Sequence, residues 1–163
     1  MPHLVDALPA NDALEMNILL VDDDDVAVEN VMRSIKKLGV QFPVVVAEDG
    51  QDALDILHEK HPEKKIKAPY VVLLDLKMPR MDGFEFLETI RQDAKLESTV
   101  VFVLTTSDSN LDRAKAYNEN IAGYMLKDTT TIFNWLFSLL PKYTNFVNLL
   151  NLSNQKRSSS ERN

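Results

Sequence analysis

The sequence predicts an α/β fold, a doubly wound parallel sheet of five strands with helices on both faces. Short apolar runs alternate five times with stretches whose apolar residues recur at helical spacing, which is the pattern of repeated strand-helix units. The runs are continuously apolar, as in strands buried on both faces. With right-handed crossovers, the common strand order for this class is 2-1-3-4-5, and we expect that order here.

The first two strand-helix units precede residue 62. A strand is predicted at residues 17–21, directly before four consecutive aspartates. Apolar residues at helical spacing then predict a helix that ends at Gly39 and contains Val28, Val31, Met32, Ile35 and Leu38. A second strand is predicted at residues 42–47. Its helix ends before Pro62 and contains Ala53, Leu54 and Leu57.

The third unit contains the most informative stretch of the chain. A tyrosine and four aliphatic residues, 70–74, run into a single carboxylate, Asp75, and a loop with proline and glycine follows. This pattern predicts a buried strand that ends at Asp75. A helix is expected from Gly83, with Asp82 as its N-cap, and contains Phe84, Leu87, Ile90 and Ala94.

The last two units are less regular. A fourth strand is predicted at residues 100–104, ending at Thr105, and a weaker helix follows with Leu111, Ala114 and Tyr117. A fifth strand at residues 122–126 ends at Lys127. The fifth helix is stopped by Pro141 and contains Ile132, Phe133, Leu136, Leu139 and Leu140.

Composition excludes several classes of protein. The formal net charge of −7 disfavours nucleic-acid binding, and the absence of cysteine excludes disulfides and thiol chemistry. No apolar run approaches the roughly 20 residues of a membrane span, and residues 1–16 lack the features of a signal peptide. We therefore expect a soluble, cytoplasmic protein with neither a membrane nor a nucleic-acid partner.

Polar residues stand at the carboxyl ends of the predicted strands, which meet at one edge of a parallel sheet. These residues are Asp22, Asp23, Asp75, Thr105 and Lys127. Carboxylate oxygens suit Mg²⁺, and a carboxylate can itself attack phosphorus. Asp75 is the best candidate nucleophile, and Asp22 and Asp23 are candidate metal ligands. Lys127 and the Thr105 hydroxyl would each contact an oxygen of a phosphoryl group.

Simpler interpretations remain for the acidic residues. Asp75 alone would equally well close a strand as a turn residue. Asp22 and Asp23 would otherwise belong to a solvated acidic turn. For Asp24 and Asp25 we prefer that interpretation, with Asp25 as a helix N-cap. No nucleophile with a neighbouring base supports acyl transfer, and no glycine-rich loop follows the first strand to support dinucleotide binding.

Residues 16–140 resemble the receiver domain of two-component response regulators, the CheY-like family with a flavodoxin-like fold. Four segments at the strand ends carry the resemblance: residues 18–23 (ILLVDD), 73–83 (LLDLKMPRMDG), 103–106 (VLTT) and 123–127 (GYMLK). They are most similar to stand-alone receivers, including those that are partners of phytochrome-type kinases. The family is not enzymatic beyond its own phosphorylation and dephosphorylation.

The resemblance implies a role for each residue of the site. Asp75 would accept a phosphoryl group from a sensor histidine kinase, with Lys127 beside it. Thr105 and Tyr124 would form the switch pair that alters the face made by the fourth helix, fifth strand and fifth helix. Mg²⁺ would be held by Asp22, Asp23, Asp75 and the backbone carbonyl of Lys77.

Two residues depart from the family pattern. The family usually has proline, often with a cis bond, where this chain has Asp128. A cis bond before a residue other than proline costs roughly 3–4 kcal/mol. The bond between Lys127 and Asp128 can therefore be trans, which leaves a different placement of Lys127 open. Lys77, two residues after Asp75, puts a long cation at the entrance of the site. We expect it to modulate the lifetime of the phosphoryl group.

The predicted domain organisation leaves no segment for a DNA-binding or enzymatic output domain. We expect a leader at residues 1–15, a receiver domain at 16–140, a short helical extension at 141–152 and a disordered tail at 153–163. The signal would then leave through a downstream protein or a phosphotransfer partner. The broad apolar surface of the fifth helix is covered either by the extension or by a homodimer partner.

Two other functions compete with this interpretation. A phosphatase of the haloacid dehalogenase type also uses a strand-end aspartate with Mg²⁺. It requires a second aspartate two residues after the nucleophile, where this chain has Lys77. The second alternative is a receiver-like module that binds a protein without being phosphorylated.

Overall fold

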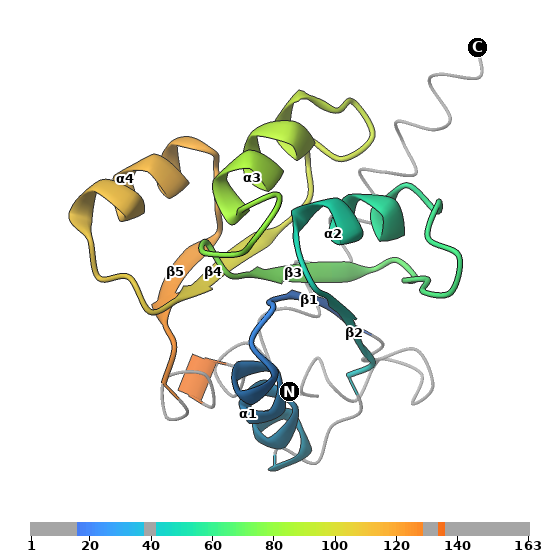
Figure 1. Ribbon diagram of the computed structural model, residues 1–163, viewed down its shortest axis with the longest axis horizontal. Helices are drawn as coiled ribbons and strands as arrows, with labels where there is room; N and C mark the ends of the chain where they lie inside the picture. Colours follow the sequence, from blue (N-terminus) through green and yellow to red (C-terminus); the bar gives the residue numbers. More distant parts are fainter. Residues whose placement is uncertain (1–15, 38–41, 129–133, 136–163) are drawn as a thin grey trace, which may run out of the picture.

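The computed structural model describes residues 16–37, 42–128 and 134–135 (Figure 1). Within these ranges, strands and helices alternate along the chain in the following order: β1 (Asn17–Val21), α1 (Asp25–Lys37), β2 (Val44–Ala47), α2 (Gly50–Leu57), β3 (Tyr70–Leu74), α3 (Gly83–Gln92), β4 (Val101–Thr105), α4 (Asn110–Asn118) and β5 (Gly123–Leu126). The predicted fifth helix lies almost wholly outside the described residues. The leader, the extension and the tail lie wholly outside them. None of the described helices is long and apolar enough to cross a membrane.

The five strands form one parallel sheet in the order β2-β1-β3-β4-β5, as the sequence predicts. Val21 at the end of β1 lies opposite Ala47 of β2 and Leu74 of β3. Thr105 at the end of β4 lies opposite Leu126 of β5. The last residues of neighbouring strands are thus aligned, so the residues that follow them reach the same edge of the sheet.

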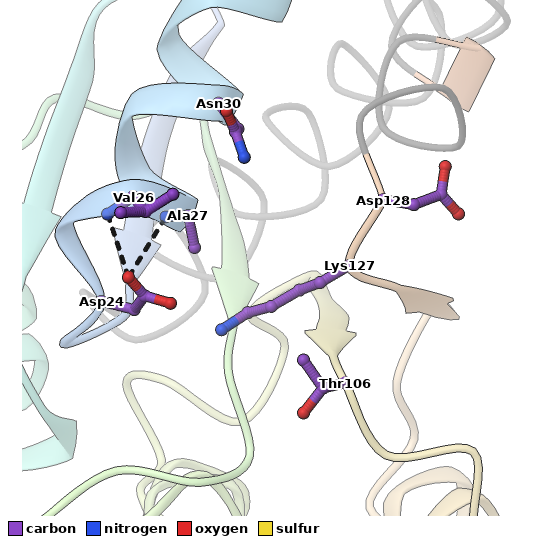
Figure 2. Close-up of a pocket in the computed structure, with 7 residues that line it drawn as sticks. All are labelled: Asp24, Val26, Ala27, Asn30, Thr106, Lys127 and Asp128. Carbon is purple, nitrogen blue, oxygen red and sulfur yellow. Dashed lines mark hydrogen bonds between the residues drawn. The ribbon is translucent and has the colours of Figure 1, made fainter.

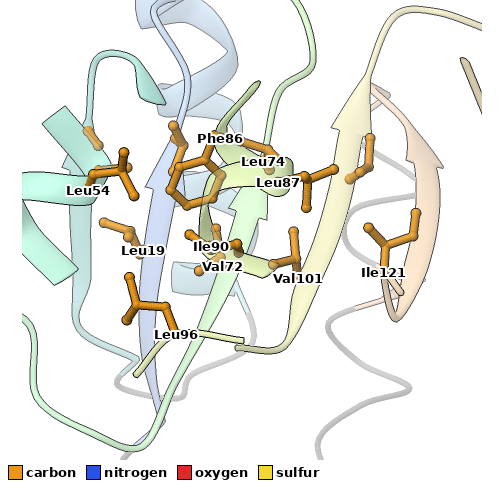
Figure 3. Close-up of a cluster of buried hydrophobic side chains, with 14 of the residues drawn as sticks. Leu19, Leu54, Val72, Leu74, Phe86, Leu87, Ile90, Leu96, Val101 and Ile121 are labelled. Carbon is orange, nitrogen blue, oxygen red and sulfur yellow. The ribbon is translucent and has the colours of Figure 1, made fainter. Parts of the chain in front are cut away.

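The sheet separates two hydrophobic clusters because successive side chains of a strand point to opposite faces. α2, α3 and α4 cover one face and α1 covers the other (Figure 1). The larger cluster lies under the three helices and includes the fully buried Leu19, Val72, Leu74, Phe86 and Ile90 (Figure 3). The smaller cluster packs α1 against alternate residues of the same strands, among them Ile18, Leu20, Val71 and Leu73.

Helix starts are fixed by side-chain caps. Asp82 caps α3, as predicted, by accepting a hydrogen bond from the amide of Glu85. The expected cap of α1 was wrong by one residue: Asp24 Oδ1 accepts from the amide of Val26 at 2.9 Å, and Asp25 is the first residue of the helix. β2 begins at Val44, two residues later than predicted, after Pro43, which has no amide hydrogen.

Candidate functional site

Three carboxylates meet at the carboxyl edge of the sheet. Asp22, Asp23 and Asp75 each offer an oxygen, and these three oxygens lie within 4.8 Å of one another. Hydrogen bonds of the sheet continue into this cluster, because the amide of Asp75 donates to Val21 at 2.9 Å and that of Asp22 donates to Ala47 at 3.0 Å. Asp22 and Asp75 are buried, whereas Asp23 is exposed. The structure therefore brings together the three acids that the sequence singled out.

Lys127 reaches this cluster from the end of β5. Its ammonium lies 2.8 Å from Asp22 Oδ2 and 3.2 Å from Asp75 Oδ2. Its amide donates to the carbonyl of Thr105 at 2.8 Å, which anchors its backbone to β4. The absence of proline at 128 left the placement of Lys127 open, and here the anchored backbone and the long side chain bring its ammonium to the acids.

The backbone after Lys127 makes a hydrogen bond that proline could not make. In the part of the chain that the structure describes, the cis bond is Ala68–Pro69, and the bond between Lys127 and Asp128 is trans. The amide of Asp128 donates to the carbonyl of Leu126 at 2.9 Å. Proline lacks this donor. Asp128 therefore supports a tight turn at the end of β5.

The charges of the cluster shift one another's protonation. Burial raises the pKa of Asp75, and the negative charge of Asp22 raises it further, whereas Lys127 acts in the opposite direction. For Lys127, burial by itself favours the neutral amine. Its bonds and charge interactions with Asp22 and Asp75 outweigh burial, so its pKa is raised. Lys127 therefore stays charged at neutral pH and neutralises part of the buried negative charge.

The cluster fits a divalent cation. Its three carboxylates and one ammonium carry a net charge of 1 − 3 = −2 when all are ionised. Oxygen ligands of this kind are those that small, hard divalent cations prefer. The backbone runs from Asp75 through Leu76 to Lys77, whose amide donates to Asp75 Oδ1 at 3.4 Å. Asp22, Asp23 and Asp75 are thus the residues that would hold such an ion.

Thr105 and Tyr124 are joined through one residue, Ser107. Thr105 is fully buried at the end of β4, and its hydroxyl accepts a hydrogen bond from the amide of Ser107 at 3.2 Å. The Tyr124 hydroxyl donates to the carbonyl of Ser107 at 2.8 Å. Ser107 Oγ in turn donates to Asp112 Oδ2 of α4 at 2.6 Å. Sequence reasoning missed Ser107, because its polar side chain fits a loop equally well.

Tyr124 is held on a second side as well. The guanidinium of Arg113 lies 4.8 Å from the centre of its ring, which is a cation-π distance. Burial is the main cause that raises the pKa of the Tyr124 hydroxyl. The hydroxyl is therefore a donor at neutral pH, in agreement with its bond to Ser107.

A hollow of about 200 Å³ opens beside Lys127. Its lining comes from the start of α1 and from the segments after β4 and β5: Asp24, Val26, Ala27, Asn30, Thr106, Lys127 and Asp128. Figure 2 shows the side chain of Lys127 extended across it, between Asp24 and Thr106. Lys77 is exposed, and its ammonium forms no ion pair with any residue that the structure describes.

Comparison with known proteins agrees with this geometry. Residues 18–132 match the family model of the response regulator receiver domain. The chain is 36% identical over 124 residues to the probable methanogenesis regulatory protein FilR2 of Methanothrix harundinacea, covering 74% of this chain and 79% of that protein. It is 31% identical over 110 residues to response regulator Rcp1 of Synechocystis, covering 68% and 75%.

Solved structures give the same result. The phosphorylated cyanobacterial phytochrome response regulator RcpA superposes with a TM-score of 0.69 at 26% identity, over 77% of this chain and 91% of that one. The Mn²⁺-bound form of Rcp1 superposes with a TM-score of 0.67 at 26% identity, over 78% and 94%. The chain therefore belongs to the family of two-component response regulators and contains its receiver domain.

Proposed function

We propose that Asp75 accepts a phosphoryl group from the phosphohistidine of a sensor histidine kinase, in a reaction that depends on Mg²⁺. The observation that carries this proposal is the buried Asp75 carboxylate, 3.2 Å from the Lys127 ammonium and next to two further carboxylates. Asp22, Asp23, Asp75 and the backbone carbonyl of Lys77 are the proposed ligands of Mg²⁺. The receiver domain is proposed to span residues 16–140.

In the proposed transfer, an oxygen of Asp75 forms a bond to phosphorus as the phosphorus-nitrogen bond breaks. The electron pair of that bond returns to the imidazole, which then takes a proton from water. Bound Mg²⁺ would neutralise charge on the phosphoryl oxygens. Lys127 pairs with one of these oxygens, and the Thr105 hydroxyl donates a hydrogen bond to another.

The phosphoryl group would act as a switch because it adds a charge of roughly −1.5 to −2 and strong hydrogen-bond acceptors. Attraction of the Thr105 hydroxyl to this group changes its bond with Ser107, and Ser107 also holds Tyr124 and α4. The face of α4, β5 and the predicted fifth helix then changes shape for a downstream protein or a phosphotransfer partner. RcpA is described as a phytochrome response regulator, which supports a phytochrome-type kinase as the donor.

The test is phosphorylation with a small phosphodonor and Mg²⁺, followed by mass spectrometry of the intact chain. We expect one phosphoryl adduct on the wild type, none with Asp75→Asn and none in EDTA. Asp55→Asn, which changes an α2 carboxylate bonded to Gln51, is the matched control and should keep the adduct. An adduct that persists on Asp75→Asn would refute the proposal.

The same preparation separates the alternatives. Turnover of phosphate esters would indicate a phosphatase. Absence of both adduct and turnover would favour a module that binds its partner without phosphorylation. The predicted homodimer contacts, through the fifth helix and the extension, involve residues outside those described and stay a prediction, as does the cytoplasmic location.

A further inference from the structure

The loop between β3 and α3 is packed tightly at the end near Asp75. The amide of Gly83 donates to the carbonyl of Leu76 at 3.1 Å. A Cβ atom at Gly83 would lie 2.4 Å from the Asp75 carbonyl oxygen, too close for any residue but glycine. The start of α3 therefore fixes Asp75 and Leu76 directly.

The other end of this loop rests on a different element, the start of α2. The amide of Gly50 donates to the carbonyl of Met81 at 3.0 Å. The Arg80 guanidinium contacts the carboxylate of Asp49. Asp49 is only 1% exposed, whereas the Arg80 side chain is 70% exposed. A surface arginine thus reaches down to a buried carboxylate and ties the loop to α2.

The backbone of Arg80 is in a conformation that arginine rarely adopts. Its φ angle is 62°, in the left-handed region that favours glycine. Such conformations persist where surrounding contacts hold them, and they concentrate at functional sites. Here the holding contacts are those to Asp49 and between Met81 and Gly50. Arginine therefore occupies a position at which glycine would have no backbone strain.

Between these two attachments lies Lys77, whose carbonyl is a proposed metal ligand. Lys77 is exposed, and its amide reaches Asp75 Oδ1 only at 3.4 Å, a long hydrogen bond. Contacts of Lys77 itself thus fix its carbonyl weakly. Its position is set by the two ends of the loop, and one of those ends is held by Arg80 and Asp49.

We propose that Arg80 and Asp49 are positioning residues that hold the β3–α3 loop so that the Lys77 carbonyl can bind the divalent cation. This inference rests on the proposed function of the site. Neither residue touches the cation. They act through the backbone of the loop, and they link metal affinity to an ion pair at the start of α2.

Two substitutions test this clamp, by which we mean the ion pair of Arg80 and Asp49. One of them separates the ion pair from helix capping. Asp49 Oδ1 also accepts a hydrogen bond from the amide of Asp52 at 2.8 Å, as the N-cap of α2. Asparagine caps helices as well as aspartate does, so Asp49→Asn removes the charge and keeps the cap. Arg80→Gly removes the guanidinium and relaxes the backbone. The matched control is Arg33→Ala, which removes an exposed ion pair with Glu29 on α1.

Binding of Mg²⁺ alone is measured by calorimetry on the full chain, beside thermal unfolding and amide exchange of residues 76–81 in EDTA. We expect each variant to bind Mg²⁺ about tenfold more weakly, as for other residues that orient metal ligands. The double variant should be no weaker than either single one, because both remove the same contact. Loop amides should exchange faster without metal, and Arg33→Ala should match the wild type.

The outcomes distinguish this inference from the proposed function. A merely structural role would lower the unfolding temperature and leave the Mg²⁺ dissociation constant and loop exchange unchanged. That result, with Mg²⁺ still bound by the wild type, would overturn the clamp and leave the proposed site standing. Failure of the wild type to bind Mg²⁺, or normal binding by Asp22→Asn, would overturn the metal site and the inference with it.

Discussion

Replacement of Lys127 by methionine tests the electrostatics of the site most directly. Its ammonium is the cation that contacts two buried carboxylates, 2.8 Å from Asp22 and 3.2 Å from Asp75. Methionine has a similar length and fills the same space, so the change removes a charge without opening a cavity. What remains is a pair of buried like charges.

The size of the effect follows from burial. The side chains of Asp22, Asp75 and Lys127 are 2%, 6% and 12% exposed, so solvent screens this cluster little. Removal of one partner from a buried ion pair costs about 3–5 kcal/mol. The desolvation cost of the ammonium is also removed, which places our expectation at the lower end, about 3 kcal/mol of unfolding free energy in EDTA at pH 8.

Mg²⁺ should reverse part of this loss. Without the ammonium, the cation has no competitor for Asp22 and Asp75, so Lys127→Met should bind Mg²⁺ more tightly than the wild type. An ion present at 100 times its dissociation constant contributes about 2.7 kcal/mol to the folded state. The difference in stability between variant and wild type should therefore shrink as Mg²⁺ is added.

The assay is urea unfolding in EDTA and in a series of Mg²⁺ concentrations. Lys95→Met, at an exposed lysine after α3, is the control and should change stability by less than about 0.5 kcal/mol. If Lys127→Met unfolds in EDTA at the same free energy as the wild type, the ammonium does not neutralise the acids. The electrostatic account of the site would then be wrong.

Three further predictions concern the same edge of the sheet. Burial and Asp22 raise the pKa of Asp75, so the folded state holds the Asp75 proton more tightly than the unfolded chain does. The free energy of unfolding therefore falls as pH rises from the pKa of Asp75 in the unfolded chain to its raised pKa in the folded state. Asp75→Asn should therefore be more stable than the wild type at pH 7, with the gain vanishing in acid, as urea unfolding would show. Lys77→Asn should lose its phosphoryl group at a different rate from the wild type, and faster if the exposed ammonium obstructs water; equal decay rates by mass spectrometry would contradict this. Gly83→Ala should cost about 2 kcal/mol, because its Cβ would meet the Asp75 carbonyl at 2.4 Å; wild-type stability in urea would count against the close contact.

The sheet and the acidic cluster could be predicted from the sequence for one physical reason. Strands buried on both faces are continuous apolar runs, and parallel strands bring their carboxyl ends to one edge. Asp22, Asp75, Thr105 and Lys127 each follow or close such a run, so their convergence follows from the topology alone. The cap at Asp82 was likewise predictable from local sequence.

Contacts between loops could not be predicted from the sequence in this way. Ser107 and Asp49 are ordinary residues for turns and caps, and Arg80 is an ordinary surface residue by type. Nothing in their spacing indicates which partners the fold supplies. The placement of Lys127 was also left open by the missing proline, and it depends on the backbone bond to Thr105 and on the flexible side chain. Helix caps within an acidic run are also ambiguous by one residue, as at Asp24.

The edge-on contact between Trp135 and Phe102 gives the molecule a spectroscopic reporter of its own. The two ring centres are 4.8 Å apart, and Trp135 is the single tryptophan of the sequence. Phe102 belongs to β4, the strand whose last residue is Thr105. A rearrangement that travels along β4 from Thr105 would change the surroundings of one fluorophore, so events at the proposed phosphorylation site could be followed in real time without a label.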